Sequence, residues 1–258
     1  MAYWQDRMAK AQDVLTAKRT KEVEKQLIKY YSSTMKRMID EFERVYEKVL
    51  NAVEDGREPT PADLYKLDSY WKMQGQLKQE LQKLGDKTIS LLSKEFELNF
   101  FDIYYSIALD STVAYATIST EAAKQMINQI WCADGKSWSQ RIWDNTELLA
   151  DTLNEGLIHC VATGKRTTEL KNVLQERFAV SYGRADALVR TELAHVQTQA
   201  AKQRYEDAGI QEVMVWADKD ERQCEHCGSL HQKRFPASGT MPIPAHPRCR
   251  CCIVPVVE

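Results

Sequence analysis

Residues 224–252 read CEHCGSLHQKRFPASGTMPIPAHPRCRCC, and this stretch decides how the end of the chain can fold. It holds five of the seven cysteines and three of the five histidines. Cys224 and Cys227 form a C-x-x-C pair, and His246 and Cys249 form an H-x-x-C pair after a spacer of residues 228–245. Thiolate and imidazole are the ligands that a tetrahedral structural Zn²⁺ prefers. The spacing matches a zinc ribbon in which one cysteine is exchanged for histidine.

Glycines and prolines interrupt this stretch, so we expect mostly loop and turn, held together by a metal. We expect Cys251 to compete with Cys249 for the fourth ligand position, on the premise that the side chains of an extended C-x-C pair face opposite ways. His226 and His231 are alternates. Four protein ligands leave no position for water, which predicts a structural site and no catalytic one. The other interpretation is a metal-free tail of reduced, packed cysteines.

The composition is that of an ordinary soluble protein of 258 residues, 43% hydrophobic and 28% charged, with a formal net charge of −2. No overall basicity supports binding to nucleic acid or to an anionic membrane. The first residues, MAYWQDRMAK, lack the apolar core of a secretory signal. The most apolar run, residues 98–109, is too short to span a bilayer. Clustered cysteines without a signal favour reduced thiols and metal over disulfides.

Residues 4–53 contain neither glycine nor proline and predict one long helix. Apolar residues recur along it in steps of three and four, as in a coiled-coil seam. The helix either projects and packs on a partner or folds back so that the seam is intramolecular core. The seam residues are Ile28, Tyr31, Met35, Met38, Phe42, Val45 and Val49.

A second helix is predicted from Pro61, which follows the Thr60 cap, to Leu84. The Gly85-Asp86 pair is expected to close it before helical periodicity resumes at Thr88. Thr120 is expected to cap a short helix. The remaining helices are predicted at 121–131, 138–162, 169–178 and 181–209.

After Gly209 the pattern changes to two strands, one within QEVMVWA (211–217) and an edge strand at 253–257. The predicted fold class is mainly α, with a small C-terminal antiparallel β unit stapled by the Cys/His site. We predict three regions: a long helical arm (1–58), a helical region (59–136) and a C-terminal module (137–258) whose Cys/His part is 210–258.

Other residue patterns carry little chemistry. Asp218, Asp220 and Glu221 invite a reading as a catalytic carboxylate pair, but a solvated turn accounts for them more simply. Arg190-Thr191-Glu192 is helical and its spacing indicates no role. The sequence has no G-x-S-x-G, phosphate-loop or dinucleotide motif, so we predict neither catalytic nor cofactor-binding residues.

Three segments together carry a family resemblance: LVRTELAHVQTQAAKQRYEDAGI, VWADKDERQCEHCGSLHQKRF and PIPAHPRCRC. They resemble the phage head-morphogenesis family, the Mu F-like minor capsid proteins. In that family, R-T-E on a helix precedes D-x-R-x-C-x-x-C and then H-P-x-C-R-C. Residues 138–178 and the early Tyr3-Trp4 pair are also similar. One departure from the family pattern is His231-Gln232, which stands where family members often have Asp-Gly. The matching residues are Arg190, Thr191, Glu192, Asp220, Arg222, Cys224, Cys227, His246, Pro247, Cys249, Arg250 and Cys251.

The resemblance implies a minor virion protein of a tailed phage, located in the capsid interior near the portal and in the host cytoplasm during assembly. It implies roles in head morphogenesis and in genome packaging or ejection. Its expected partners are the portal protein and other head proteins, with packaged DNA and self-association through the first helix also open. No membrane span is expected.

Two other functions stay open at this point. A zinc-dependent nuclease or hydrolase acting during phage entry would need an open metal position and a base such as Asp220 or Glu192. A DNA-binding zinc ribbon would use the local basic residues. These are Lys233, Arg234, Arg248 and Arg250.

Overall fold

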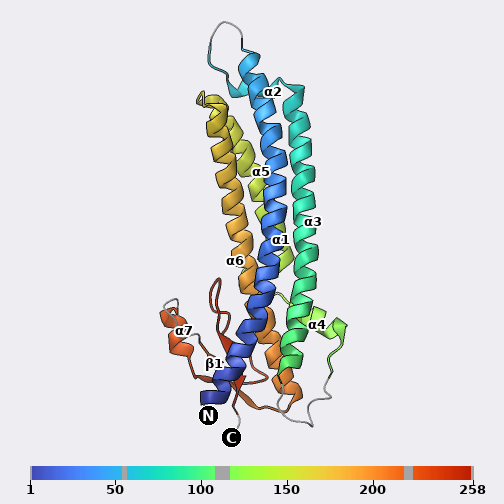
Figure 1. The fold of residues 1–258 in the computed structure, drawn as a ribbon, viewed down its shortest axis with the longest axis vertical. Helices are drawn as coiled ribbons and strands as arrows, with labels where there is room; N and C mark the ends of the chain where they lie inside the picture. The colour runs from blue at the N-terminus through green and yellow to red at the C-terminus, as the bar shows by residue number, and fades with distance from the viewer. Residues whose placement is uncertain (1, 54–56, 108–116, 218–222, 257–258) are drawn as a thin grey trace. The chain divides into compact units, whose positions relative to one another are not determined.

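The computed structural model describes residues 2–53, 57–107, 117–217 and 223–256. As predicted, it is mainly helical with a small antiparallel sheet near the C-terminal end (Figure 1). None of the helices in the described ranges combines the length and apolarity needed to cross a bilayer. The elements are α1 (Ala2–Asn51), α2 (Pro61–Tyr65), α3 (Asp68–Ser106), α4 (Thr120–Ile127), α5 (Trp138–Ala162), α6 (Thr167–Asp207), β1 (Glu212–Trp216), α7 (Glu225–Leu230), β2 (Arg234–Pro236) and β3 (Cys252–Pro255).

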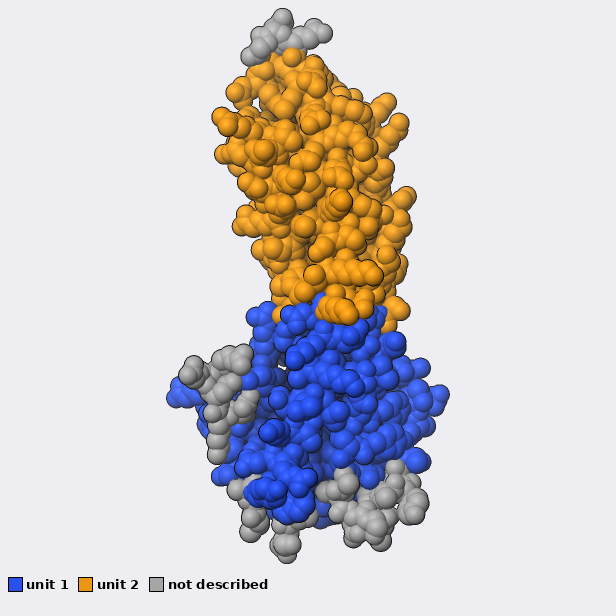
Figure 2. All heavy atoms as spheres, in the orientation of Figure 1, with its two compact units in different colours: residues 1–24, 91–138, 187–258 blue, residues 25–90, 139–186 orange. Residues whose placement is uncertain are grey.

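The chain forms two compact units, coloured separately in Figure 2. Unit 1 comprises residues 1–24, 91–138 and 187–258, and unit 2 comprises residues 25–90 and 139–186. Helices α1, α3 and α6 therefore contribute residues to both units. The division into three sequence regions stays a prediction.

In unit 2, segments of α1, α3, α5 and α6 run side by side (Figure 1). The seam of α1 is largely intramolecular core here: Phe42 and Val49 are fully buried, although Ile28 is 49% exposed. The hydroxyl of the buried Tyr46 donates to the carbonyl of Cys160 on α5, 3.1 Å away. Of the two interpretations of the seam, folding back is therefore the one that the structure supports.

Helix α3 does not end at Gly85-Asp86, where the sequence predicted a break. A Cβ on Gly85 would lie 2.3 Å from the indole of Trp143 on α5. Glycine at this position lets the two helices approach closely, and its helical neighbours keep the backbone regular. The prediction was wrong because it took a packing glycine for a helix terminator.

Helix α6 is likewise continuous, although Ser181 was predicted to begin a separate helix. Ser181 is buried, and its backbone carbonyl accepts a hydrogen bond from Nδ2 of Asn145 at 3.0 Å. A lone serine without proline does not stop a helix whose neighbours pack on both sides. At α4, Ser119 caps the helix in place of Thr120, accepting from the N–H of Ala122 at 3.1 Å.

The sheet of unit 1 has strand order β2-β1-β3, with both pairs antiparallel. Val213 and Val215 of β1 and Ile253 of β3 are fully buried. Among the described strands β3 pairs only with β1, so Pro255 lies on an edge strand, as predicted. β2 and α7 lie in the segment that the sequence predicted to be loop and turn.

Buried hydrogen bonds join α1 and α6 to β3 within unit 1. Nε2 of Gln12 donates to the carbonyl of Ile253 at 3.0 Å, and the hydroxyl of Tyr205 donates to the same carbonyl at 3.2 Å. Nε1 of Trp216 donates to Asp6 at 3.1 Å. Because buried polar groups are costly when unpaired, these bonds fix the positions of β3 and of the end of β1 against the helices.

Candidate metal centre

The C-x-x-C pair lies on the first turn of α7. Cys224 caps this helix, and its Sγ accepts a hydrogen bond from the backbone N–H of Cys227 at 3.3 Å. That hydrogen bond lowers the pKa of the Cys224 thiol. The short helix thus places two sulfur atoms on one side and favours the thiolate form that a metal binds.

The H-x-x-C pair lies on a turn in which the N–H of Cys249 donates to the carbonyl of His246 at 3.1 Å. Nδ1 of His246 lies 2.9 Å from the carbonyl oxygen of Pro247. A carbonyl only accepts, so Nδ1 carries the proton and the lone pair of Nε2 faces Sγ of Cys227 at 3.2 Å. This tautomer is the one that metal-binding histidines adopt.

The predicted ligand residues meet in two overlapping groups. Cys224, Cys227 and His246 form one, and Cys227, Cys249 and Cys251 form the other; the donor atoms of each group lie within 4.8 Å of one another. The sulfur atoms of Cys227 and Cys249 are 3.8 Å apart. Two sulfurs bound to one tetrahedral Zn²⁺ at about 2.3 Å would be separated by about 3.8 Å. The cluster can hold a metal ion.

The sequence predicted that the side chains of Cys249 and Cys251 face opposite ways, and this prediction was wrong. The donor atoms of Cys227, Cys249 and Cys251 all lie within 4.8 Å of one another. The prediction misapplied the alternation of side chains in an extended chain, in which neighbouring residues face opposite ways and residues two positions apart share a face. Cys249 and Cys251 are two positions apart, so even an extended chain places both thiols on one side.

The alternate histidines lie elsewhere among the described residues. Nδ1 of His231 accepts a hydrogen bond from the N–H of Ala217 at 3.2 Å, and its ring packs on Trp216. His226 lines a separate cavity. Neither belongs to the two donor groups.

The clustered thiols cannot all ionise without a cation. The S–H of Cys251 donates to Cys249, which lowers the pKa of Cys249 to about 5 and raises that of Cys251. Burial raises the pKa of Cys227 to about 12. A divalent cation would offset the charge of the thiolates, and soft sulfur donors favour zinc over magnesium or calcium.

The R-T-E residues contact three different parts of unit 1. The hydroxyl of Thr191 donates to the carbonyl of Ala187 at 2.7 Å and accepts from the backbone N–H of Arg248 at 3.0 Å. Glu192 is buried and accepts from Nε1 of Trp131 at 3.0 Å, and Arg190 pairs with Glu24 at 3.4 Å. Thr191 thereby holds the turn that carries His246 and Cys249. Sequence spacing gave no signal for this contact.

Residues 151–254 match the family model described as Phage Mu protein F like protein. This confirms the resemblance read from the sequence. The Mu F-like segment, residues 151–254, contains both the R-T-E residues and every candidate metal ligand. The match supports a phage head- or capsid-related protein. No curated protein and no solved structure matches the chain.

The sequence also suggested a catalytic carboxylate pair and a DNA-binding basic patch in the Mu F-like segment. Asp218, Asp220, Glu221 and Arg222 lie outside the described residues. Of the local basic residues, Arg234 pairs with Glu212 at 3.5 Å, and Lys233, Arg248 and Arg250 are exposed. The carboxylate pair and the DNA-binding patch stay predictions.

Proposed function

We propose that this protein is a minor head protein of a tailed phage, which binds the portal and other head proteins on the inner side of the capsid. The observation that carries the proposal is the overlap of the family match with the Cys/His cluster and with the Thr191 contact that positions it. In this proposal the protein acts in head morphogenesis, with genome packaging or ejection as the stage that it serves.

The metal centre in this proposal is a structural zinc site. Cys227 lies in both donor groups, so it would bind the ion together with Cys249, His246 and one further cysteine, Cys224 or Cys251. Zinc bound there supplies a crosslink between α7 and the turn before β3. Its binding free energy would be part of the folding free energy of unit 1, because the unfolded chain holds no preformed site.

A catalytic role receives less support. A four-coordinate ion among five donor residues has no need of a water ligand, and an open position is what a hydrolytic zinc site requires. Glu192, one of the two candidate bases, is 3% exposed and already accepts a hydrogen bond from Trp131. We therefore propose a protein without enzymatic activity.

The test is copurification from cells that co-produce this chain with the tagged portal and capsid proteins of its phage. Full-length chain is compared with a variant in which residues of the metal cluster are changed, Cys224→Ser with Cys227→Ser, and with the matched variant Cys252→Ser outside the cluster. Deletion of the first helix is a poor test, since its seam is buried in unit 2.

We expect the full-length chain to copurify with the portal and to be found inside assembled heads by electron microscopy of labelled particles. Cys252→Ser should behave like the full-length chain, whereas the double variant should copurify less. Heads that assemble with normal frequency and composition without the chain would overturn the proposal. Binding of the purified chain to DNA that weakens steeply with salt would favour the DNA-binding ribbon.

A further inference from the structure

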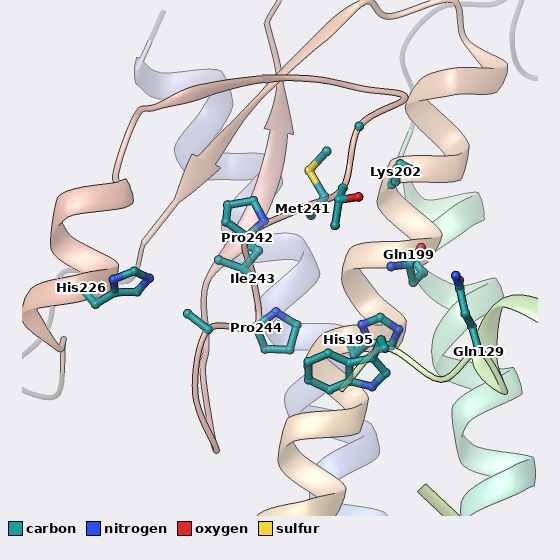
Figure 3. Close-up of a pocket in the computed structure, with 13 residues that line it drawn as sticks. Gln129, His195, Gln199, Lys202, His226, Met241, Pro242, Ile243 and Pro244 are labelled. Atoms are coloured by element: carbon teal, nitrogen blue, oxygen red, sulfur yellow. The ribbon is translucent and has the colours of Figure 1, made fainter. Parts of the chain in front are cut away.

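A cavity of about 460 Å³ lies in unit 1, outside the metal cluster. One wall is a face of α6 that carries His195, Gln199 and Lys202, spaced one and two helical turns apart. The opposite wall is the loop 239–245, and Gln129 closes a third side. Figure 3 shows Pro242 and Pro244 of this loop across from His195 and Gln199.

The lysine and histidine residues that line the cavity have no acidic counterpart among the described residues of the lining. The lining contains one lysine, two histidines and two glutamines, and no aspartate or glutamate is among the described residues that form it. This differs from the chain as a whole, whose formal net charge is −2. Lys202 pairs with Glu206 at 3.4 Å, a residue outside the lining. Its ammonium group has donors to spare for a second acceptor.

His195 adds a buried polar group without a partner. It is 3% exposed, and its ring stacks on Trp131 with centroids 4.4 Å apart and planes at 8°. Its Nε2 is buried and has no hydrogen-bond partner among the described residues. Burial lowers the pKa of His195 to about 4, so the ring is neutral at pH 7. Unpaired buried groups of this kind call for an explanation, and a ligand in the cavity provides one.

The loop wall is suited to an apolar body. Met241, Pro242, Ile243 and Pro244 contribute it, and the two prolines have no N–H to donate. Most of the polar side chains lie on the α6 side and at Gln129, with Thr240 and His226 as the other polar side chains of the lining, and they face this apolar surface. This division of polar and apolar walls is typical of small-ligand sites.

We propose that this cavity binds an oxyanion, a carboxylate or a phosphate, carried on a small apolar body. Lys202, Gln129 and Gln199 supply the donors, and the Nε2–H tautomer of His195 supplies a further one. The apolar body lies against Met241, Ile243 and the two prolines. None of the lining residues is a ligand of the proposed metal centre, although His226 and Ala245 are neighbours of its ligands in the chain. The site does not depend on the proposed role in the phage head.

The test uses three probes on the full chain: N-acetylglutamate, its uncharged analogue N-acetylglutaminamide, in which both carboxylates are replaced by amides, and inorganic phosphate. Binding is followed by the nuclear magnetic resonance signals of the histidine rings, with the His195 signal assigned from its loss in His195→Gln. Lys202→Met removes the cation of the cavity. Lys165→Met is the matched control, because Lys165 also forms an ion pair with a glutamate four residues later, at 3.3 Å, outside the cavity.

We expect N-acetylglutamate to shift the His195 signal saturably, and N-acetylglutaminamide to bind at least about tenfold more weakly, since a charge-assisted hydrogen bond is lost. Lys202→Met should weaken N-acetylglutamate by a similar factor, and Lys165→Met should not. Saturable binding of phosphate without N-acetylglutamate would support the site with an inorganic or phosphoryl oxyanion as its ligand. The proposal is overturned if neither anion shifts His195, if both acetylated probes bind equally, or if Lys202→Met binds like the unaltered chain.

Discussion

The hydroxyl of Thr191 accepts a hydrogen bond from the backbone N–H of Arg248, a residue 57 positions later in the chain. The bond joins α6 to the turn that carries His246 and Cys249. Thr191, the central residue of R-T-E, therefore has a positioning role: it holds the turn that carries His246 and Cys249 and is not itself a donor of the cluster.

Replacing Thr191 with valine should loosen the metal centre. Valine keeps the shape of threonine but cannot accept the Arg248 N–H, and losing one such bond costs about 1 kcal/mol, or about a fivefold loss of zinc affinity. The measurement is zinc transfer to a competing chelator. Thr152→Val is the control, because Thr152 also donates to the carbonyl four residues earlier, at 2.9 Å, and serves no turn of the cluster. Equal zinc retention by both variants would contradict the positioning role.

The zinc content of cysteine variants should distinguish Cys227, a residue of the cluster, from Cys252, which lies outside it. The chain should bind about one zinc ion, as expected for a closed structural site. Cys227→Ser should abolish stoichiometric binding because Cys227 belongs to both donor groups. Cys252→Ser should not, because the Sγ of Cys252 donates to the carbonyl of Trp216, a role that a hydroxyl can take over. Chelation should also lower the unfolding temperature of the unaltered chain; an unchanged value would show that the metal contributes nothing to folding.

Two glycines of α3 should respond in opposite ways to alanine. Gly85→Ala should destabilise unit 2 by about 1–3 kcal/mol, because its Cβ would overlap the indole of Trp143. Gly75 has no atom within 4 Å of the corresponding position and is exposed. Gly75→Ala should therefore stabilise the helix by about 0.5–1 kcal/mol. Both values are read from urea unfolding, and a neutral Gly85→Ala would mean that the two helices can move apart at little cost.

The stability that depends on His195 should fall in mild acid. Its pKa is lowered by burial from an ordinary 6.5 to about 4, so the unfolded chain binds the proton first as the pH falls. This contribution is complete above pH 6.5 and is lost progressively toward pH 4. His195→Phe keeps an aromatic ring on Trp131 but cannot titrate.

Between pH 7 and pH 5, the unaltered chain should lose about 2 kcal/mol more unfolding free energy than His195→Phe does. The other histidines and the thiols are common to both chains, so their titration cancels in the difference. A pH-independent difference between the chains would show that His195 is not held neutral by burial.

The sequence predicted the elements with strong signals. Helix 138–162 was predicted with the bounds that the structure has, because Gly164, with φ of +59°, terminates it. The donor residues were predicted because cysteine and histidine spacing reflects metal chemistry directly. Errors arose where a residue has a role set by a distant contact. Gly85 depends on Trp143 and Ser181 on Asn145, and neither partner is visible from local pattern.

The geometry of the candidate site was less predictable for the same reason. Arg248 has a left-handed backbone, with φ of +61°, at a non-glycine residue where no propensity would place it. The contact of Thr191 with the same residue links segments far apart in the chain. Both features are products of tertiary packing.

The shared carbonyl of Ile253 has a consequence for the order in which the chain can fold as it is made. Its two donors, Gln12 and Tyr205, are synthesised long before it, so the interior of unit 1 stays open to water until β3 has left the ribosome. Every residue of unit 2 has been made by position 186. We therefore expect the helical bundle of unit 2 to fold during translation. The Cys/His part of unit 1 should fold only after the ribosome has passed β3, so a partner that binds unit 1 can do so only after that point.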